Sequence, residues 1–275
     1  MLQDLGRHVF KNEFSLRHEP RDEDFVLIFK EHEILIGGDG LHEPLFLPQV
    51  SNVTDKSLLY LFSIDSRGYY LYCGDSINIH IEGFSFQSHM VLRSDNPRIV
   101  CFAGFTAYHL FNFYQHNRFC GRCGSPTIHS QKERALLCTK CANIIYPRIA
   151  PAVIVGIVHE DKLLVTRYKD RPYGGLALIA GFCEIGETPE DTARRECMEE
   201  VGLRIKDLKY CGSQPWGLDS NVLMGFMASV DGEPVIRRDD GELAEAFWIT
   251  RDEITQEDSP ISLTKTMILN FKMQI

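Results

Sequence analysis

Three glutamates on one short segment are the residues best suited to chemistry. Glu196, Glu199 and Glu200 stand at i, i+3 and i+4, a spacing that puts them on one face of a helix. Like charges at this spacing repel, so the face is destabilised unless a cation binds there. Carboxylate oxygens are ligands that Mg²⁺ and Mn²⁺ prefer, and such ions also bind substrate phosphates and activate water. The spacing therefore predicts either a Mg²⁺ or Mn²⁺ site for phosphate chemistry or a solvated acidic helix face.

A second group of chemically active residues is a set of cysteines in two Cys-x-x-Cys pairs, Cys120, Cys123, Cys138 and Cys141. Thiolates at this spacing suit a tetrahedral Zn²⁺ ion. Because all the ligand positions are cysteines, the site is expected to be closed and structural rather than catalytic. The alternative is a pair of redox motifs, each of which would be expected beside a βαβ unit.

The glutamates need a well-bounded helix to position them, and residues 189–201 predict one. Thr188 is a good N-cap, Pro189 suits the first helical turn, and Asp191 can complete a capping box. Gly202 suits the C-terminal end, where a left-handed backbone is common. Ala193, Cys197 and Val201 form an apolar face for packing on a sheet.

The remaining elements read as a β-rich first half and an alternating second half. Before the cysteines, β-like runs are expected at 24–29, 33–36, 58–64, 69–72 and 77–81, followed by a helix at 97–118 with an aromatic packing face. After them we expect a hairpin at 152–158 and 162–167, strands near 205–211 and 222–230, an apolar stretch at 244–249, and a helix at about 262–272.

Composition excludes several classes of protein. The chain has 275 residues and a formal net charge of -9, which argues against non-specific coating of nucleic acid. Nine cysteines are an odd number, which disfavours a fully paired disulfide framework. The N-terminus has no apolar signal segment, and the longest apolar run, 152–158, is far shorter than the ~20 residues of a spanning helix. We expect a cytoplasmic protein with no membrane partner.

The helix belongs to a longer pattern, G-x5-E-x7-R-E-U-x-E-E-x-G-U, which is the Nudix box. Its fixed positions are occupied by Gly181, Glu187, Arg195, Glu196, Glu199, Glu200 and Gly202. The chain therefore resembles the Nudix hydrolases, which cleave nucleoside diphosphates linked to another group. The resemblance implies an α+β fold in which a Nudix α/β/α sandwich follows a zinc ribbon and a β-rich N-terminal domain. The boundaries expected are 1–115 for the β-rich domain ending in a helix, 116–146 for the ribbon and 147–275 for the Nudix domain.

The resemblance also implies roles for individual residues. Catalysis would rest on Arg195, Glu196, Glu199 and Glu200, with Arg195 orienting the carboxylates through a bidentate pair. Glu242 matches a further acidic position and would be either a metal ligand or the base that activates water. The Mg²⁺ or Mn²⁺ ligands implied are Glu187, Glu196, Glu199, Glu200 and Glu242.

Two features outside the box resemble the NADH pyrophosphatase branch of the family. One is the cysteine ribbon followed by Tyr146-Pro147-Arg148, and the other is the sequence 213–216, Ser-Gln-Pro-Trp. Family members usually continue Pro-Phe-Pro-x-Ser, whereas this chain has Gly-Leu-Asp-Ser-Asn at 217–221, which makes a more mobile loop the expectation. In this branch Tyr146 and Phe182 match positions that stack on a base, with core packing as the alternative. Gln214 and Trp216 would line the cleft, with a hydrophobic plug as the alternative for Trp216.

The function implied is hydrolysis of the pyrophosphate of NAD(H) to nicotinamide mononucleotide and AMP, together with removal of the NAD cap from RNA. A homodimer is implied by resemblance alone. The loop at 217–221 keeps open a Nudix hydrolase for another nucleotide, such as ADP-ribose or a dinucleoside polyphosphate. A third reading is a non-catalytic nucleotide-sensing or RNA-binding module, although a sensor has no need of the complete set of glutamates.

Overall fold

The computed structural model describes residues 1–74, 79–94, 96–169, 175–255 and 261–273. It divides into two compact units. One contains 149–216 and 221–275 together with Met1, and the other contains 2–148 together with the turn 217–220. Within the described ranges, no helix is both long enough and apolar enough to span a membrane.

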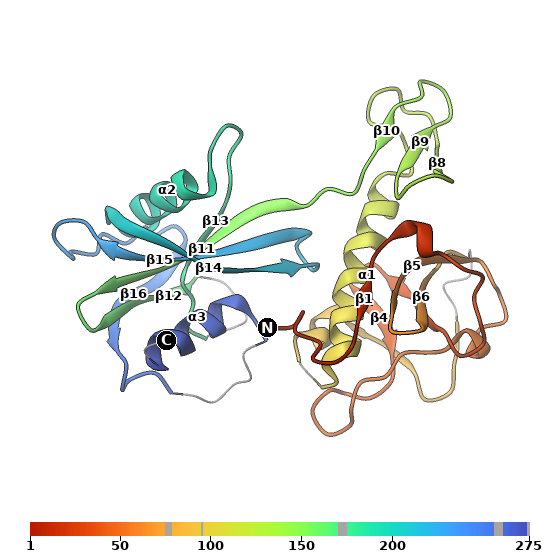
Figure 1. The fold of residues 1–275 in the computed structure, drawn as a ribbon, viewed down its shortest axis with the longest axis horizontal. Helices are drawn as coiled ribbons and strands as arrows, with labels where there is room; N and C mark the ends of the chain where they lie inside the picture. The colour runs from red at the N-terminus through yellow and green to blue at the C-terminus, as the bar shows by residue number, and fades with distance from the viewer. Residues whose placement is uncertain (75–78, 95, 170–174, 256–260, 274–275) are drawn as a thin grey trace. The chain divides into compact units, whose positions relative to one another are not determined.

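The C-terminal unit is built on a mixed sheet in the order β14-β15-β11-β12-β16 (Figure 1). In this sheet β11 and β12 form the predicted hairpin, β15 runs parallel to β11, and β13 pairs antiparallel with β11. The strands are β11 (Ala150–His159), β12 (Lys162–Tyr168), β13 (Ile179–Phe182), β14 (Ile205–Trp216), β15 (Asn221–Val230) and β16 (Leu243–Thr250).

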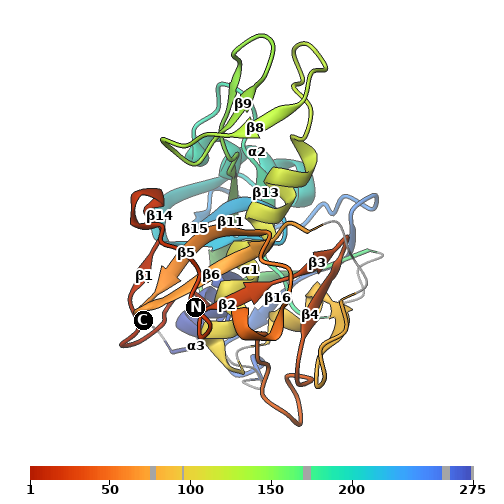
Figure 2. The same cartoon turned by 90° about the vertical axis from the view of Figure 1, so that its right-hand side faces the viewer.

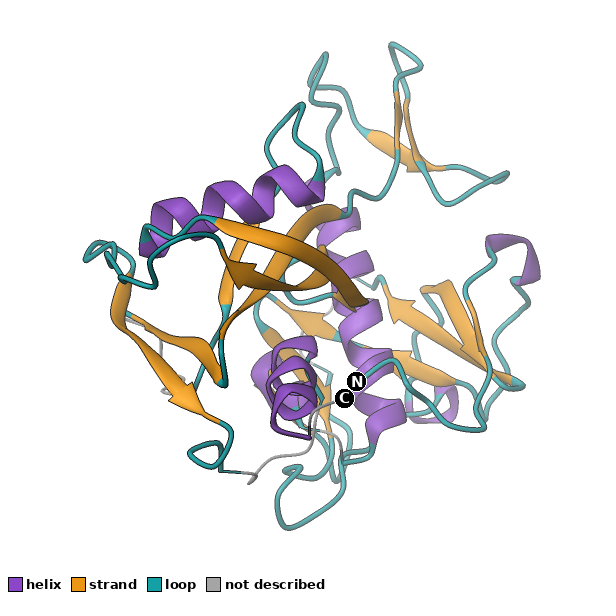
Figure 3. Cartoon of the chain, turned by 60° about the vertical axis from the view of Figure 1, so that its left-hand side comes forward, coloured by secondary structure: helices purple, strands orange, loops and turns teal. Residues whose placement is uncertain are grey.

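Helices α2 (Pro189–Val201) and α3 (Leu263–Met273) cover opposite faces of this sheet (Figure 3). Successive side chains of a strand point to opposite faces, and β11 shows this directly. Val153 packs with Ala193 and Cys197 of α2, whereas Ile154 packs with residues of α3 such as Met267. The layers confirm the expected α/β/α sandwich.

The N-terminal unit contains two small sheets and one long helix. The first sheet has the order β1-β5-β6-β2 and the second the order β3-β4-β7. The strands are β1 (Phe10–Lys11), β2 (Phe25–Leu27), β3 (Phe29–Lys30), β4 (Glu33–Ile36), β5 (Leu58–Ile64), β6 (Arg67–Tyr72) and β7 (Ser85–Ser88), and the short 3-10 helices are η1 (Phe14–Leu16), η2 (Val50–Asn52) and η3 (His89–Arg93).

Helix α1 (Arg98–His116) lies against these sheets through aromatic contacts (Figure 2). The ring of Phe102 is 5.0 Å from that of Phe10, and the ring of Phe111 is 5.1 Å from that of Phe29. The helix ends two residues earlier than 118, where Asn117 donates a hydrogen bond from its side chain to the carbonyl of Phe113 (2.8 Å). The aromatic face is therefore core, as predicted.

The ribbon follows α1 and forms the sheet β10-β9-β8, from β8 (Thr127–His129), β9 (Leu136–Cys138) and β10 (Ile144–Ile145). Arg134, between β8 and β9, donates from Nη2 to the carbonyls of Asn12 (3.1 Å) and Leu61. These bonds connect the ribbon to the N-terminal sheet within one compact unit.

Several elements differ from expectation. The run 24–29 is split into β2 and β3, and the strand near 205–211 continues to Trp216. β7 and β13 were not predicted, because each is a segment of four residues that is defined by its partner strand rather than by its own alternation. The strand expected at 77–81 lies partly outside the described residues.

Candidate active site and metal centre

Helix α2 begins and ends at the residues that local rules select. Thr188 Oγ1 accepts a hydrogen bond from the backbone N–H of Asp191 (3.1 Å), and Gly202 adopts a left-handed φ of 66° at the C-cap. The capping box differs from expectation. The carboxylate of Asp191 accepts from the hydroxyl of Thr188 (2.7 Å), whereas a capping box would have it accept from the N-cap backbone. The helix is therefore fixed at both ends, and its acidic residues have defined positions.

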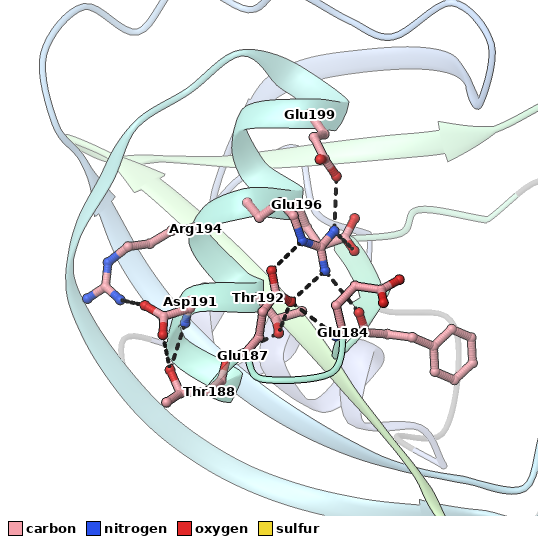
Figure 4. Close-up of polar contacts among 10 residues, drawn as sticks. Glu184, Glu187, Thr188, Asp191, Thr192, Arg194, Glu196 and Glu199 are labelled. Carbon is pink, nitrogen blue, oxygen red and sulfur yellow. Dashed lines mark hydrogen bonds and ion pairs between the residues drawn. The ribbon is translucent and has the colours of Figure 1, made fainter.

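The guanidinium of Arg195 holds the carboxylates of α2 and of the preceding loop together (Figure 4). It forms a bidentate pair with Glu187, from Nε to Oε1 at 2.7 Å and from Nη2 to Oε2 at 2.9 Å. Nη1 donates to both Glu196 (2.7 Å) and Glu199 (3.0 Å). Nη2 also donates to the carbonyl of Phe182 (3.0 Å), which ties the helix to the end of β13.

The carboxylates differ in their electrostatics. Hydrogen bonds from Arg195, from the backbone N–H of Glu184 and from Thr192 lower the pKa of Glu187 to about 2. Burial raises the pKa of Glu196, against the lowering effect of Arg195, and the nearby charges of Glu199 and Glu242 raise it further. This interaction places Glu242, the residue just before β16, within electrostatic range of Glu196. The group is therefore an assembly of like charges with one resident counter-ion, Arg195.

Close packing against β13 fixes two of these carboxylates. A Cβ atom on Gly181 would lie 2.0 Å from Cδ of Glu196, so the absence of a side chain at 181 is what lets the carboxylate lie against the strand. Glu200 is only 2% exposed, and its Oε1 accepts a hydrogen bond from the backbone N–H of Ala180 (3.4 Å). Their positions depend on β13, an element that sequence patterns did not reveal.

These residues fit a hard divalent cation by the chemistry of their donors. All the candidate ligand atoms are carboxylate oxygens, and burial together with like charges raises the pKa of Glu196, an effect that a bound cation would oppose. Arg195 occupies the centre of the group in this structure, and the oxygens are not gathered as tightly as metal ligands are. Among the described residues, the only group of three or more metal-binding side chains close enough to share one ion is the cysteine cluster.

The Sγ atoms of that cluster, from Cys120, Cys123, Cys138 and Cys141, lie within 4.8 Å of one another. The Cys120–Cys141 and Cys123–Cys138 sulfur separations are 3.7 and 3.4 Å. A tetrahedral ion with Zn–S bonds of ~2.3 Å requires sulfur separations of about 3.8 Å. The amides of Lys140 and Cys141 point at Cys138 Sγ, each at 3.4 Å, as donors that stabilise a thiolate. The cluster fits a structural Zn²⁺ ion.

The predicted cleft residues have different environments. Phe182 is 53% exposed, whereas Trp216 is 9% exposed and lies at the end of β14 opposite Asn221. Gln214 is fully buried, donates to the carbonyl of Ile261 (2.8 Å) and accepts from the N–H of Leu263 (2.7 Å). These bonds hold the start of α3 on the sheet, so a substrate contact by Gln214 stays a prediction.

Tyr146 belongs to the N-terminal unit and is 50% exposed. Its hydroxyl donates to Oε1 of Glu133 (3.0 Å), and this hydrogen bond raises the pKa of the phenol. Sequence reasoning missed Glu133, because its separation of thirteen positions from Tyr146 matches no period of a helix or strand. The contact gives Tyr146 a fixed orientation while half of its surface remains open.

Comparison with known proteins agrees with this geometry. Residues 148–267 match the model of the NUDIX domain. The chain contains a Nudix domain. Residues 115–146 match the NADH pyrophosphatase zinc ribbon domain, and this match includes all the cysteines of the cluster.

Curated relatives match the chain over 160 residues. The chain is 41% identical over 160 residues to proteins named NAD-capped RNA hydrolase NudC from Salmonella typhi and Salmonella enteritidis. This match covers 58% of the chain and 62% of each relative, so the chain spans less than two thirds of the length of the curated relatives it matches. A NUDIX hydrolase structure from Nitrosomonas europaea has a TM-score of 0.50 at 24% identity, covering 57% of this chain and 91% of that one, and it supports the fold alone.

The turn that departs from the pattern of the Nudix branch begins at Gly217. A Cβ atom there would lie 2.0 Å from the carbonyl oxygen of Phe105 in α1, within the N-terminal compact unit. A residue with a side chain at 217 would force the backbone of the turn away from that of Phe105. The glycine that departs from the branch pattern therefore lies at a close backbone contact. This contact explains the glycine, whereas the mobility expected for the loop stays a prediction.

Proposed function

We propose that this protein hydrolyses the pyrophosphate of NAD(H) to nicotinamide mononucleotide and AMP. The observation that carries the proposal is the 41% identity with proteins named NAD-capped RNA hydrolase, over a segment long enough to span both the ribbon and the Nudix domain. The complete box on α2 supports an active enzyme rather than a sensor, because catalysis is what requires every one of its carboxylates. The same pyrophosphate occurs in NAD-capped RNA, so cap removal is proposed as a second activity.

The carboxylates of α2 and its flanking loops would hold Mg²⁺ or Mn²⁺. When bound, such ions neutralise the diphosphate and supply an activated water. Glu187, Glu196, Glu199 and Glu200 offer the oxygens, and Glu242 is proposed as a further ligand or as the proton acceptor. Arg195 keeps Glu187 ionised and oriented through its bidentate pair.

Base recognition is proposed for Phe182 and Tyr146. Aromatic side chains with one open face suit stacking, because every base offers a π-face. Both residues are about half exposed, which supports a binding role over core packing. Gln214 and Trp216 are proposed to shape the cleft from the β14 side.

We also propose the domain boundaries, the oligomeric state and the compartment of the protein. It comprises a β-rich domain at 1–115, a zinc ribbon at 116–146 and a Nudix domain at 147–275, acting as a cytoplasmic homodimer. Sedimentation of the purified protein tests the dimer, with a monomer at micromolar concentration as the contradicting result.

The reaction is tested by comparing kcat/KM for NADH, NAD⁺, NAD-capped RNA, ADP-ribose and a dinucleoside polyphosphate in the presence of Mg²⁺ or Mn²⁺. We expect the NAD-containing substrates to be preferred, with nicotinamide mononucleotide and AMP as products. A preference for ADP-ribose would replace the proposal with the alternative that the changed turn at 217–221 favours. No turnover of any substrate by the zinc-loaded protein would favour a binding module.

A further inference from the structure

A cavity outside the Nudix domain lies between the N-terminal sheet and the ribbon, within one compact unit. Its volume is about 440 Å³, inside the range of ~300–1,000 Å³ that small-molecule sites occupy. Its walls include Tyr60 of β5 and Tyr70 of β6, Tyr114 of α1, and His129 and Arg134 of the ribbon. None of these residues belongs to the Nudix box.

Arg134 is one of two arginines that line this cavity, the other being Arg17, and it has no anionic partner among the residues that the structure describes. Its Nη2 donates to the backbone carbonyls of Asn12 and Leu61. Its Nη1 is buried and has no hydrogen-bond partner in the described part of the chain. A buried donor without a hydrogen-bond partner costs stability. An anionic ligand in the cavity would supply the missing acceptor.

A second polar group beside Arg134 is also unsatisfied. Tyr60 is 6% exposed, and its hydroxyl finds no hydrogen-bond partner among the residues described. The phenols of Tyr60 and Tyr114 are within electrostatic range of Arg134, so these polar groups converge on one region of the cavity. By contrast, the neighbouring hydroxyl of Tyr70 is paired, because it donates to the carbonyl of His18 (2.8 Å).

The other walls narrow the class of ligand. The ring of Tyr114 lies 5.0 Å from that of His129, and burial lowers the pKa of His129. Such rings suit a planar base. The exposed carboxylates of Glu19 and Glu133 also line the cavity and offer acceptor oxygens to the hydroxyl or amino groups of a ligand. A simple aromatic acid has no such donors, whereas a ribose and a base provide them.

We propose that this cavity is a binding site for a mononucleotide, with Arg134 and Tyr60 at the phosphate and the rings of Tyr114 and His129 at the base. The site is separate from the carboxylates of α2 and requires no Mg²⁺ or Mn²⁺. Occupancy would satisfy the buried guanidinium and tighten the contact between the ribbon and the N-terminal sheet. A mononucleotide bound there would therefore stabilise the N-terminal unit.

The test uses the zinc-loaded full-length protein and AMP as the probe, with isothermal titration calorimetry and no added Mg²⁺ or Mn²⁺. Tyr60→Phe removes only the unpaired hydroxyl, and Arg134→Gln removes the charge. Lys132→Gln is the matched control, because it removes a charge from the same ribbon at an exposed position that does not line the cavity. Phe182→Ala reports binding at the Nudix domain instead.

We expect AMP to bind the cavity at least about 5-fold more weakly in Tyr60→Phe and Arg134→Gln than in the parent protein, and equally well in Lys132→Gln. Phe182→Ala should change only a separate binding event at the Nudix domain. Tyr60→Phe should fold with an unchanged or higher thermal midpoint without AMP, which keeps the test informative if Arg134→Gln unfolds. Undetectable AMP binding at millimolar concentration, loss of binding only in Phe182→Ala, or equal affinity for AMP and inorganic phosphate would each overturn the proposal. The experiment does not measure NADH hydrolysis, so this proposal can be refuted independently of the proposed reaction.

Discussion

The substitution Gly181→Ala tests whether β13 positions the carboxylates of α2. A Cβ atom at 181 would meet Cδ and Oε1 of Glu196 at 2.0 Å, whereas ordinary contacts begin at 3.4 Å, so the carboxylate must retreat by about 1.4 Å. That movement breaks the 2.7 Å hydrogen bond between Arg195 Nη1 and Glu196. A displacement of ~1 Å in a catalytic constellation costs on the order of 10²-fold in rate, or about 2.7 kcal/mol of transition-state stabilisation.

The assay is kcat/KM for NADH at saturating Mg²⁺ or Mn²⁺, with thermal unfolding measured in parallel. The matched control is Gly156→Ala on β11, where the added Cβ would meet the flexible end of Met227 (Sδ at 2.5 Å) and no carboxylate. We expect Gly181→Ala to lose about 10²-fold in activity and Gly156→Ala to stay within a few-fold of the parent protein.

A double variant separates displacement of Glu196 from general damage to the sheet. If Gly181 acts through Glu196, then Gly181→Ala should cause little further loss in a Glu196→Ala background, because the clash is gone. Full activity of the single variant, or additive losses in the double variant, would refute the proposed role of the glycine.

Further predictions concern the N-cap of α2, the zinc cluster, the loss of stability at acidic pH and the buried side chain of Gln214. Thr188→Ala should lower the free energy of unfolding by about 0.5–2 kcal/mol, because it removes the cap at the Asp191 N–H, and denaturant titration measures it. Removal of zinc with a chelator, or Cys123→Ser, should lower the thermal midpoint, whereas Glu199→Gln should not, because structural zinc binding contributes folding free energy. An unchanged midpoint after chelation would contradict this. The folded pKa of Glu187, about 2, is below its ordinary value of 4.5, so its contribution to stability is complete above that value and is lost as pH falls from about 4.5 toward 2. Glu187→Gln should weaken the dependence of the free energy of unfolding on pH in this window. An unaltered pH dependence would contradict the low pKa of Glu187. Gln214→Leu should cost about 1–3 kcal/mol, because the buried N–H of Leu263 loses its partner, and a raised KM at unchanged stability would instead make Gln214 a substrate contact.

Local chemistry explains why some elements were predictable. The ends of α2 depend on Thr188, Pro189 and Gly202, which act on their own neighbours, and the helix spans the residues predicted. The cysteine spacing likewise predicted a cluster that the structure brings within ion-binding distance. Both signals are contained in short segments, so tertiary context did not alter them.

Long-range contacts explain what the sequence could not reveal. β13 exists because it pairs with β11, and Gln214 is buried because α3 begins beside it. The unpaired Nη1 of Arg134 and the contact of Tyr146 with Glu133 also depend on residues brought together only by folding. No period or spacing along the chain encodes these contacts.

The central claim is that the α2 carboxylates catalyse cleavage of the NAD(H) pyrophosphate, and one measurement tests it most directly. It is the rate of AMP formation from NADH by the parent protein, Glu199→Gln and Glu200→Gln at saturating Mg²⁺ or Mn²⁺, with folding confirmed by circular dichroism. We predict AMP and reduced nicotinamide mononucleotide as products and a loss of at least about 10²-fold in each variant. Undiminished AMP formation in both folded variants would contradict the claim.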